Sequence, residues 1–115
     1  MMTGGNGHIS GVWCNSVLSP LPLKNIPYNA DFKIFYYLVG TERGKVTVGL
    51  FVDDELVDTR ILDINVLNKA RPYWFRYPLS HMELTKHTIQ LKIGERIDHD
   101  IKWKYESEKY EVEVI

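Results

Sequence analysis

The fold class is decided by two stretches of sequence, ADFKIFYYLV at residues 30–39 and KVTVGLFV at residues 45–52. In both, apolar residues recur at every second position. Side chains of a strand alternate between the two faces of a sheet, so each stretch predicts a strand with one buried face. The residues expected on the buried faces are Ala30, Phe32, Ile34, Tyr36, Leu38, Val46, Val48, Leu50 and Val52.

The same rhythm returns along the rest of the chain. Asp53-Asp54-Glu55 predicts a tight reversal, so residues 45–62 are expected to form a hairpin. Glycine-rich turns are expected at residues 40–44 and 94–96, and a proline-containing loop at residues 19–27. The further strands are expected at residues 9–18, 73–79, 87–93, 101–105 and 110–114.

Together these runs predict an all-β protein, an immunoglobulin-like antiparallel β-sandwich of about seven to eight strands. Each strand supplies one apolar side, so two sheets must meet through those sides. The 115 residues suit one domain, with residues 1–7 as a flexible tail and residues 101–115 as a terminal strand extension. Cys14 is the only cysteine, so no internal disulfide is expected and the thiol is interpreted as a small apolar group.

Charge and hydropathy narrow the classes of partner. The 14 Lys and Arg residues nearly balance 15 Asp and Glu residues, which gives no long-range attraction to phosphate backbones, and no nucleic-acid partner is expected. No apolar run approaches the roughly 20 residues that span a bilayer, so no membrane insertion is expected. Residues 1–11 lack a signal-peptide pattern. The compartment stays open: cytosolic, or extracellular if the chain is a piece of a secreted protein.

Three segments between residues 30 and 93 carry a family resemblance. They are KVTVGLFVDDELV at residues 45–57, YWFRYPL at residues 73–79 and KHTIQLKI at residues 86–93. In this order they resemble the CARDB type of immunoglobulin-like domain, the cell-adhesion-related module of bacterial and archaeal surface proteins. The resemblance implies a non-catalytic spacer or adhesion module, often one of several in an extracellular protein.

No group of residues points to catalysis. The four histidines are scattered, Ser80 and His81 are only chain neighbours, and no phosphate-binding glycine pattern occurs. Acidic residues at 53, 54 and 58, and the segment Asp98-His99-Asp100, are two candidates for cation sites, but turn chemistry explains them more simply. The sequence therefore predicts no enzyme, no metal and no cofactor. A small hydrolase without a recognisable motif ranks as the third hypothesis.

The candidate site is an outward-facing group of Phe35, Tyr37, Trp74 and Arg76. If the neighbouring residues face the core, these four point outward from two strands that lie side by side. Aromatic and arginine side chains anchor protein interfaces, so a protein partner or a second copy is the first hypothesis. The alternative ligand is a carbohydrate, stacked on the aromatic rings. A competing interpretation places the first strand or the terminal extension across these residues.

A second interface is expected at the carboxyl end. Residues 105–115 alternate charged and apolar side chains and end as a strand, which predicts an open edge that pairs with another copy or another chain.

Overall fold

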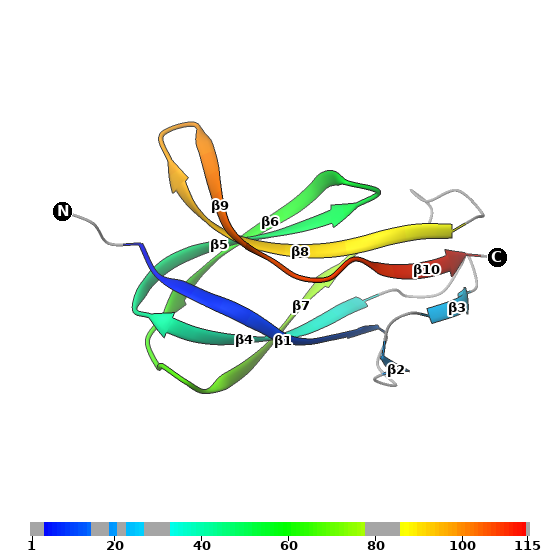
Figure 1. Ribbon diagram of the computed structural model, residues 1–115, viewed down its shortest axis with the longest axis horizontal. Coiled ribbons are helices and arrows are strands. Elements are labelled where there is room, and N and C mark those ends of the chain that lie inside the picture. Colours follow the sequence, from blue (N-terminus) through cyan, green and yellow to red (C-terminus); the bar gives the residue numbers. More distant parts are fainter. Residues whose placement is uncertain (1–3, 15–18, 21–22, 27–32, 78–85, 115) are drawn as a thin grey trace.

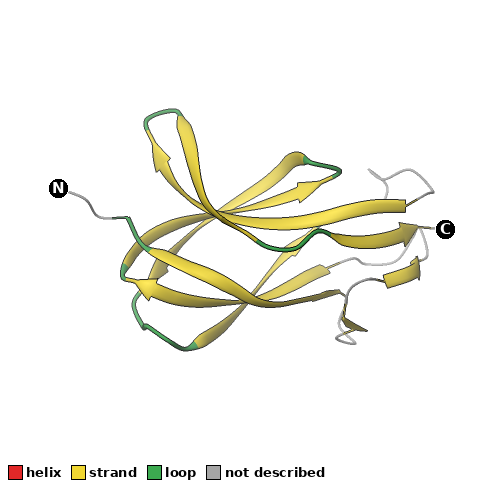
Figure 2. Cartoon of the chain, in the orientation of Figure 1, coloured by secondary structure: helices red, strands yellow, loops and turns green. Residues whose placement is uncertain are grey.

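Strands and short turns make up the whole described part of the chain (Figure 2). The computed structural model describes residues 4–14, 19–20, 23–26, 33–77 and 86–114. Predictions that concern Ala30, Phe32, Ser80 and His81 fall outside these residues. The strands are β1 (Asn6–Cys14), β2 (Ser19–Pro20), β3 (Leu23–Ile26), β4 (Lys33–Glu42), β5 (Gly44–Val52), β6 (Glu55–Ile64), β7 (Ala70–Arg76), β8 (Lys86–Ile97), β9 (Asp100–Glu106) and β10 (Tyr110–Val114).

These strands form two sheets that pack as layers (Figure 1). The smaller sheet has the order β2-β1-β4-β7, and the larger has the order β3-β10-β8-β5-β6 with β9 also paired to β8. All pairs are antiparallel except β3 with β10. Both β9 and β10 pair with β8 on the edge away from β5, so they act as one long strand interrupted at residues 107–109. The prediction of an all-β sandwich is confirmed.

The core lies between the sheets and follows the predicted alternation. Ile34, Tyr36 and Leu38 of β4 are at most 3% exposed, and they pack with residues of β5 and β8 in one buried cluster. Val48 and Leu91 have no exposed surface. Burying each such side chain contributes about 1.5–3 kcal/mol, so this contact between the two layers is the main source of stability.

The hairpin of β5 and β6 is also confirmed. Val52 pairs with Glu55, which leaves Asp53 and Asp54 as a two-residue turn. Their φ angles are 52° and 65°, both in the left-handed region. Two positive φ angles in a two-residue loop match the twist of antiparallel strands, and aspartate tolerates this conformation better than most residues.

The predicted flexible tail is wrong from residue 4 onward. Gly4 forms a bridge with Lys45, Gly5 donates a 2.9 Å hydrogen bond to the Lys45 carbonyl, and β1 begins at Asn6. A Cβ at Gly5 would lie 2.6 Å from the Gly44 carbonyl oxygen. Glycine is therefore needed here for a close approach of two backbones, which the sequence alone presents as flexibility.

Strand occupies most of two predicted turns, although the chain does pass from β4 to β5 at Arg43, within residues 40–44. β4 continues through Gly40 to Glu42, where Gly40 pairs with Gly7 of β1. β8 likewise continues past Gly94 to Ile97, and the chain reverses at Asp98, whose φ is 57°. Gly94 lies under the Trp103 ring, where a Cβ would meet Trp103 at 2.8 Å. Here too the glycine serves packing rather than a turn.

The strand predicted at residues 101–105 is present as part of β9, but a bulge interrupts its alternation. Ile93 pairs with Tyr105 and Gly94 pairs with Trp103, so Lys104 is an extra residue in β9. The bulge places Trp103 on the outer surface of the larger sheet and turns Tyr105 toward β1, where its hydroxyl donates to the Ile9 carbonyl.

The expected open edge at the carboxyl end is covered. β10 pairs with β8 on one side, and β3 pairs with its other side at Val112 and Val114. Residues 19–20 and 23–26, expected as loop, supply β2 and β3, and Pro20 in β2 pairs with Trp13. An edge strand accepts a proline because one side of it needs no donor.

Ser107 closes the gap between β9 and β10. Its backbone N–H donates to the Leu91 carbonyl at 2.8 Å, and its Oγ accepts from the Leu91 N–H at 3.0 Å. The Ser107 carbonyl accepts a 2.8 Å hydrogen bond from the Gln90 side chain. The Ser107 hydroxyl thus replaces the backbone acceptor that the Leu91 N–H loses where β9 and β10 are interrupted. Ser107 itself is buried.

Replacing Ser107 tests whether its hydroxyl takes the place of the missing backbone acceptor. We expect Ser107→Ala to lower the free energy of unfolding by about 1–3 kcal/mol, because the buried Leu91 N–H loses its acceptor. Urea unfolding of the variant measures the loss. Ser10→Ala changes an exposed serine of β1 and serves as control. Equal unfolding midpoints for the two variants would contradict the assigned role.

Ionisation of the Tyr36 phenol makes the free energy of unfolding depend on pH in the alkaline range. Desolvation by burial raises the pKa of the Tyr36 phenol above its ordinary 10.0, partly offset by the charge of Arg60. The unfolded chain therefore loses this proton before the folded chain does. The stabilising contribution is complete below about pH 10 and is lost as the pH rises further, at up to about 1.4 kcal/mol per pH unit.

We expect the unfolding free energy of Tyr36→Phe to fall less steeply above pH 10 than that of the parent protein, as measured by denaturant unfolding at a series of pH values. Some slope remains in the variant, because burial also raises the pKa of Tyr77 and of Tyr110. Identical slopes would show that Tyr36 ionises as easily in the folded protein as in the unfolded chain.

Candidate functional site

The four predicted site residues lie on one surface of the smaller sheet. β4 pairs with β7 in a register that sets Phe35 opposite Trp74 and Lys33 opposite Arg76. Tyr37 stands two residues beyond Phe35, opposite Pro72. Ile34 and Phe75, the alternate residues of these strands, are buried in the core. The alternation therefore turns Phe35, Tyr37, Trp74 and Arg76 to the outside, as expected.

Trp13 of β1 belongs to the same surface, although the sequence prediction of the site omitted it. It pairs with Phe35, and its ring centroid lies 4.9 Å from that of Tyr37. The ring also lies over Gly11, where a Cβ would approach Trp13 to 2.7 Å. The sequence signal for this arrangement is the glycine two residues before the tryptophan. Residues i and i+2 lie on the same face of a strand, and a residue without a side chain leaves room there for the indole ring. We call Trp13, Phe35, Tyr37 and Trp74 the aromatic face.

The rings of the aromatic face do not lie in one plane. Trp13 and Tyr37 are inclined by 58°, and Phe35 and Trp74, 6.3 Å apart, by 43°. Trp74 is 52% exposed, whereas the other three rings are partly covered by one another. Trp13 Nε1 is buried and has no hydrogen-bond partner among the described residues. The result is an uneven apolar surface with one protruding indole.

Two positive side chains lie at one end of the aromatic face. Lys33 and Arg76 face each other across β4 and β7, one pair along from Phe35 and Trp74. The aromatic face is therefore bordered at this end by two basic residues of neighbouring strands.

Neither proposed cover lies across the aromatic face in the described part of the chain. β1 pairs edge to edge with β4, and β9 and β10 belong to the larger sheet. Trp13 therefore adds to the aromatic face beside Phe35 and Tyr37 and does not cover it.

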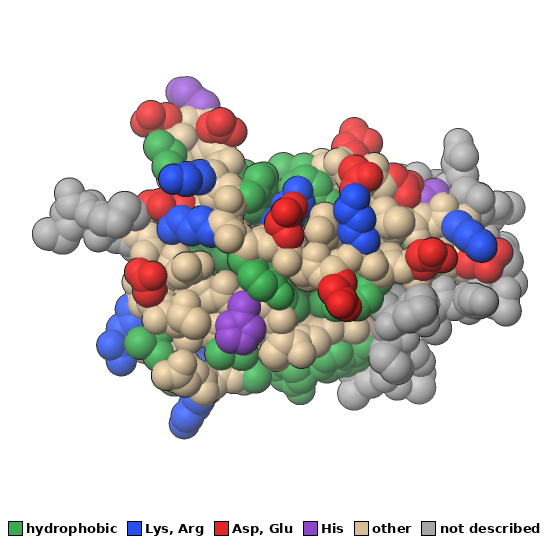
Figure 3. Space-filling view, viewed as in Figure 1, with side chains coloured by type: hydrophobic (Ala, Val, Ile, Leu, Met, Phe, Trp, Pro, Cys, Tyr) green, Lys and Arg blue, Asp and Glu red, His purple; other side chains and the backbone are tan. Residues whose placement is uncertain are grey.

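Figure 3 shows hydrophobic side chains along the border of the molecule below β1, and again in the notch between the β8–β9 and β5–β6 turns.

The second hydrophobic area lies on the outer surface of the larger sheet. Trp103 covers Gly49 and Gly94, and its ring meets Phe51 edge-on at 5.3 Å. Lys92 Nζ lies 4.3 Å from the Phe51 ring centroid and 2.9 Å from a carboxylate oxygen of Glu106. Phe51 is only 8% exposed as a result. The centre of this surface is therefore covered by its own side chains, whereas Leu56 and Ile61 of β6 lie exposed at its edge.

Asp53 and Asp54, two of the acidic residues considered as cation ligands, contact protein groups. Asp53 Oδ2 lies 2.6 Å from His87 Nδ1, and Asp53 Oδ1 accepts from the Thr88 N–H at 3.0 Å. Asp54 pairs with Lys109 at 2.7 Å, and this hydrogen bond raises the pKa of Lys109. The two carboxylates connect the β5–β6 turn to β8 and to the chain before β10. Within the described ranges, no three His, Cys, Asp or Glu side chains lie close enough to hold a metal ion.

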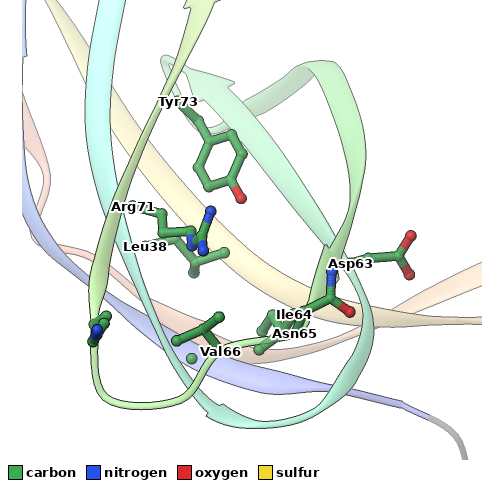
Figure 4. A pocket seen from close by; sticks show the side chains of 9 residues that line it. Leu38, Asp63, Ile64, Asn65, Val66, Arg71 and Tyr73 are labelled. Atoms are coloured by element: carbon green, nitrogen blue, oxygen red, sulfur yellow. The ribbon is translucent and has the colours of Figure 1, made fainter.

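Two hollows open between β6 and β7. The one shown in Figure 4 holds Tyr73 and Arg71 of β7 on one side and Ile64 and Asn65 on the other. Its volume of about 20 Å³ leaves room for roughly one water molecule. The other measures about 140 Å³ and is lined by Tyr36, Arg60, Leu62, Tyr73 and Trp74. Drug-sized ligands occupy pockets of about 300–1,000 Å³, so neither hollow suits a large ligand.

The described residues include no helix long and apolar enough to cross a bilayer.

In comparisons with known proteins, no family model matches the chain, and no curated protein matches it either.

Proposed function

We propose that this protein is a non-catalytic interaction module that binds a protein partner through the aromatic face. The observation that carries the proposal is the exposed indole of Trp74, 52% accessible, beside Phe35 on a regular sheet. A large ring on a rigid strand loses little conformational freedom on binding and buries much apolar area. Such residues supply most of the binding energy in protein interfaces.

The shape of the surface favours a protein over a polysaccharide. A flat sugar chain stacks best on rings that share a plane, whereas the two ring pairs here are inclined by 58° and 43°. An uneven surface with a protruding Trp74 suits a partner whose side chains fill the spaces between the rings.

The strand order supports an immunoglobulin-like assignment for this module. β4 lies between β1 and β7, and β8 lies between β5 and β10. Immunoglobulin-like sandwiches have the equivalent strands side by side in two antiparallel sheets. A role in adhesion at a cell surface, as the CARDB resemblance implies, is part of this proposal and stays a prediction.

Peptides selected from a phage-displayed library against the parent protein provide the test. We expect most selected peptides to carry apolar residues and to bind Trp74→Ser at least about 30-fold more weakly than the parent, since a central tryptophan supplies about 2 kcal/mol or more. Isothermal titration calorimetry measures the affinities. Thermal unfolding shows whether the variant remains folded, as expected for an exposed position.

Leu56→Ser is the matched control, because Leu56 is 40% exposed but belongs to the larger sheet. Peptides that bind both variants as tightly as the parent would place the interface elsewhere. Adsorption of the parent protein, but not of Trp74→Ser, to cellulose or chitin would instead support the carbohydrate alternative.

A further inference from the structure

Strand β6 is a long edge strand of the larger sheet. It ends that sheet, and its second edge has no strand partner among the described residues. Natural proteins protect sheet edges with short strands, prolines, lysines, bulges or charged residues that point inward. β6 spans Glu55–Ile64, contains neither proline nor lysine, and exposes Leu56 by 40% and Ile61 by 58%. Its one bulge, at Val57, lies near the Asp53–Asp54 turn.

The other edges of the two sheets differ from β6. In the smaller sheet, β2 pairs only with Trp13 and Cys14 of β1, β1 is bulged at Ser10, and β7 carries Pro72. In the larger sheet, β3 has four residues, and β9 carries Lys102 and Lys104. Of the described edge strands, β6 alone combines 10 residues with the absence of proline and lysine.

The charges of β6 fit a second copy of the same strand. Asp58 and Arg60 lie opposite Leu50 and Val48 of β5, so both belong to the core-facing side of the sheet. Two copies related by a two-fold axis perpendicular to the sheet pair antiparallel, with one residue opposite itself. If that residue is Thr59, Asp58 of each copy lies opposite Arg60 of the other. Opposite charges then meet twice, and a Thr–Thr pair lies between them.

The two neighbouring registers are disfavoured by the same charges. Moving the axis to Arg60 sets Arg60 opposite Arg60, and moving it to Asp58 sets Asp58 opposite Asp58. Directly opposed like charges destabilise a sheet, so β6 favours one alignment and disfavours those beside it.

Both charges are available for this role. Asp58 Oδ1 accepts a 2.8 Å hydrogen bond from the Thr59 N–H, and the Arg60 guanidinium lies 5.8 Å from the Phe75 ring centroid. Neither has a salt-bridge partner within the described part of the chain. A second copy would supply the opposite charge to each.

We propose that two copies of this chain associate through β6 in the register that centres on Thr59, joining their larger sheets into one. The contact is separate from the aromatic face, which belongs to the other sheet.

Charge reversal tests both the contact and its register. We expect Asp58→Arg and Arg60→Asp each to raise the dissociation constant of the dimer by at least about tenfold, because two attractive pairs become repulsive. Mixing the two single variants restores association, since each then offers the charge that the other needs. The double variant with both changes also dimerises. Sedimentation velocity over a range of concentrations measures all four samples.

Lys102→Asp, on the edge strand β9, is the control for altered net charge and should dimerise like the parent. Circular dichroism shows whether each variant is folded. A parent protein that stays monomeric at every concentration would overturn the proposal. So would single variants that dimerise as the parent does, or a mixture of the two that remains monomeric.

Discussion

The pairing of β8 along both of its edges is the constraint on which the rest of the structure depends. β5 occupies one edge from Ile89 to Gly94, while β10 and β9 share the other from Lys86 to Ile97. With hydrogen bonds on both sides, its core-facing residues Ile89, Leu91 and Ile93 are held where the smaller sheet can cover them, and none has exposed surface. The interruption at Ser107 is tolerated because one hydroxyl keeps the Leu91 N–H bonded.

The position of the aromatic face follows from that core. Because Ile34 and Tyr36 must face β5 and β8, Phe35 and Tyr37 between them have to face outward. β1 and β7 flank β4 in register and add Trp13 and Trp74 to the same side. The outer aromatic residues are thus fixed by the packing of the inner ones, and no loop is needed to hold them in place.

Strands with strict alternation were predictable from the sequence, and departures from it were not. The buried faces of β4, β5 and β8 and the Asp53–Asp54 turn were predicted correctly, since period two and turn chemistry are local signals. The roles of Gly5 and Gly94 were misread because backbone and indole approach them from distant segments. The bulge at Lys104, which separates Trp103 from Tyr105, also depends on pairing between strands. Trp13 was missed at the site for the same reason: its neighbour Tyr37 is remote in sequence.

The positions of the first and last strands at opposite ends of the molecule have a mechanical consequence. The chain enters β1 at one end of a body 48 Å long and leaves β10 at the other (Figure 1). Tension applied to the two ends therefore pulls the first and last strands lengthwise, against β4 on one side and β8 on the other. Hydrogen bonds loaded in this way share the force and break together, whereas a strand peeled from its end loses them one by one. The arrangement resists stretching along its long axis.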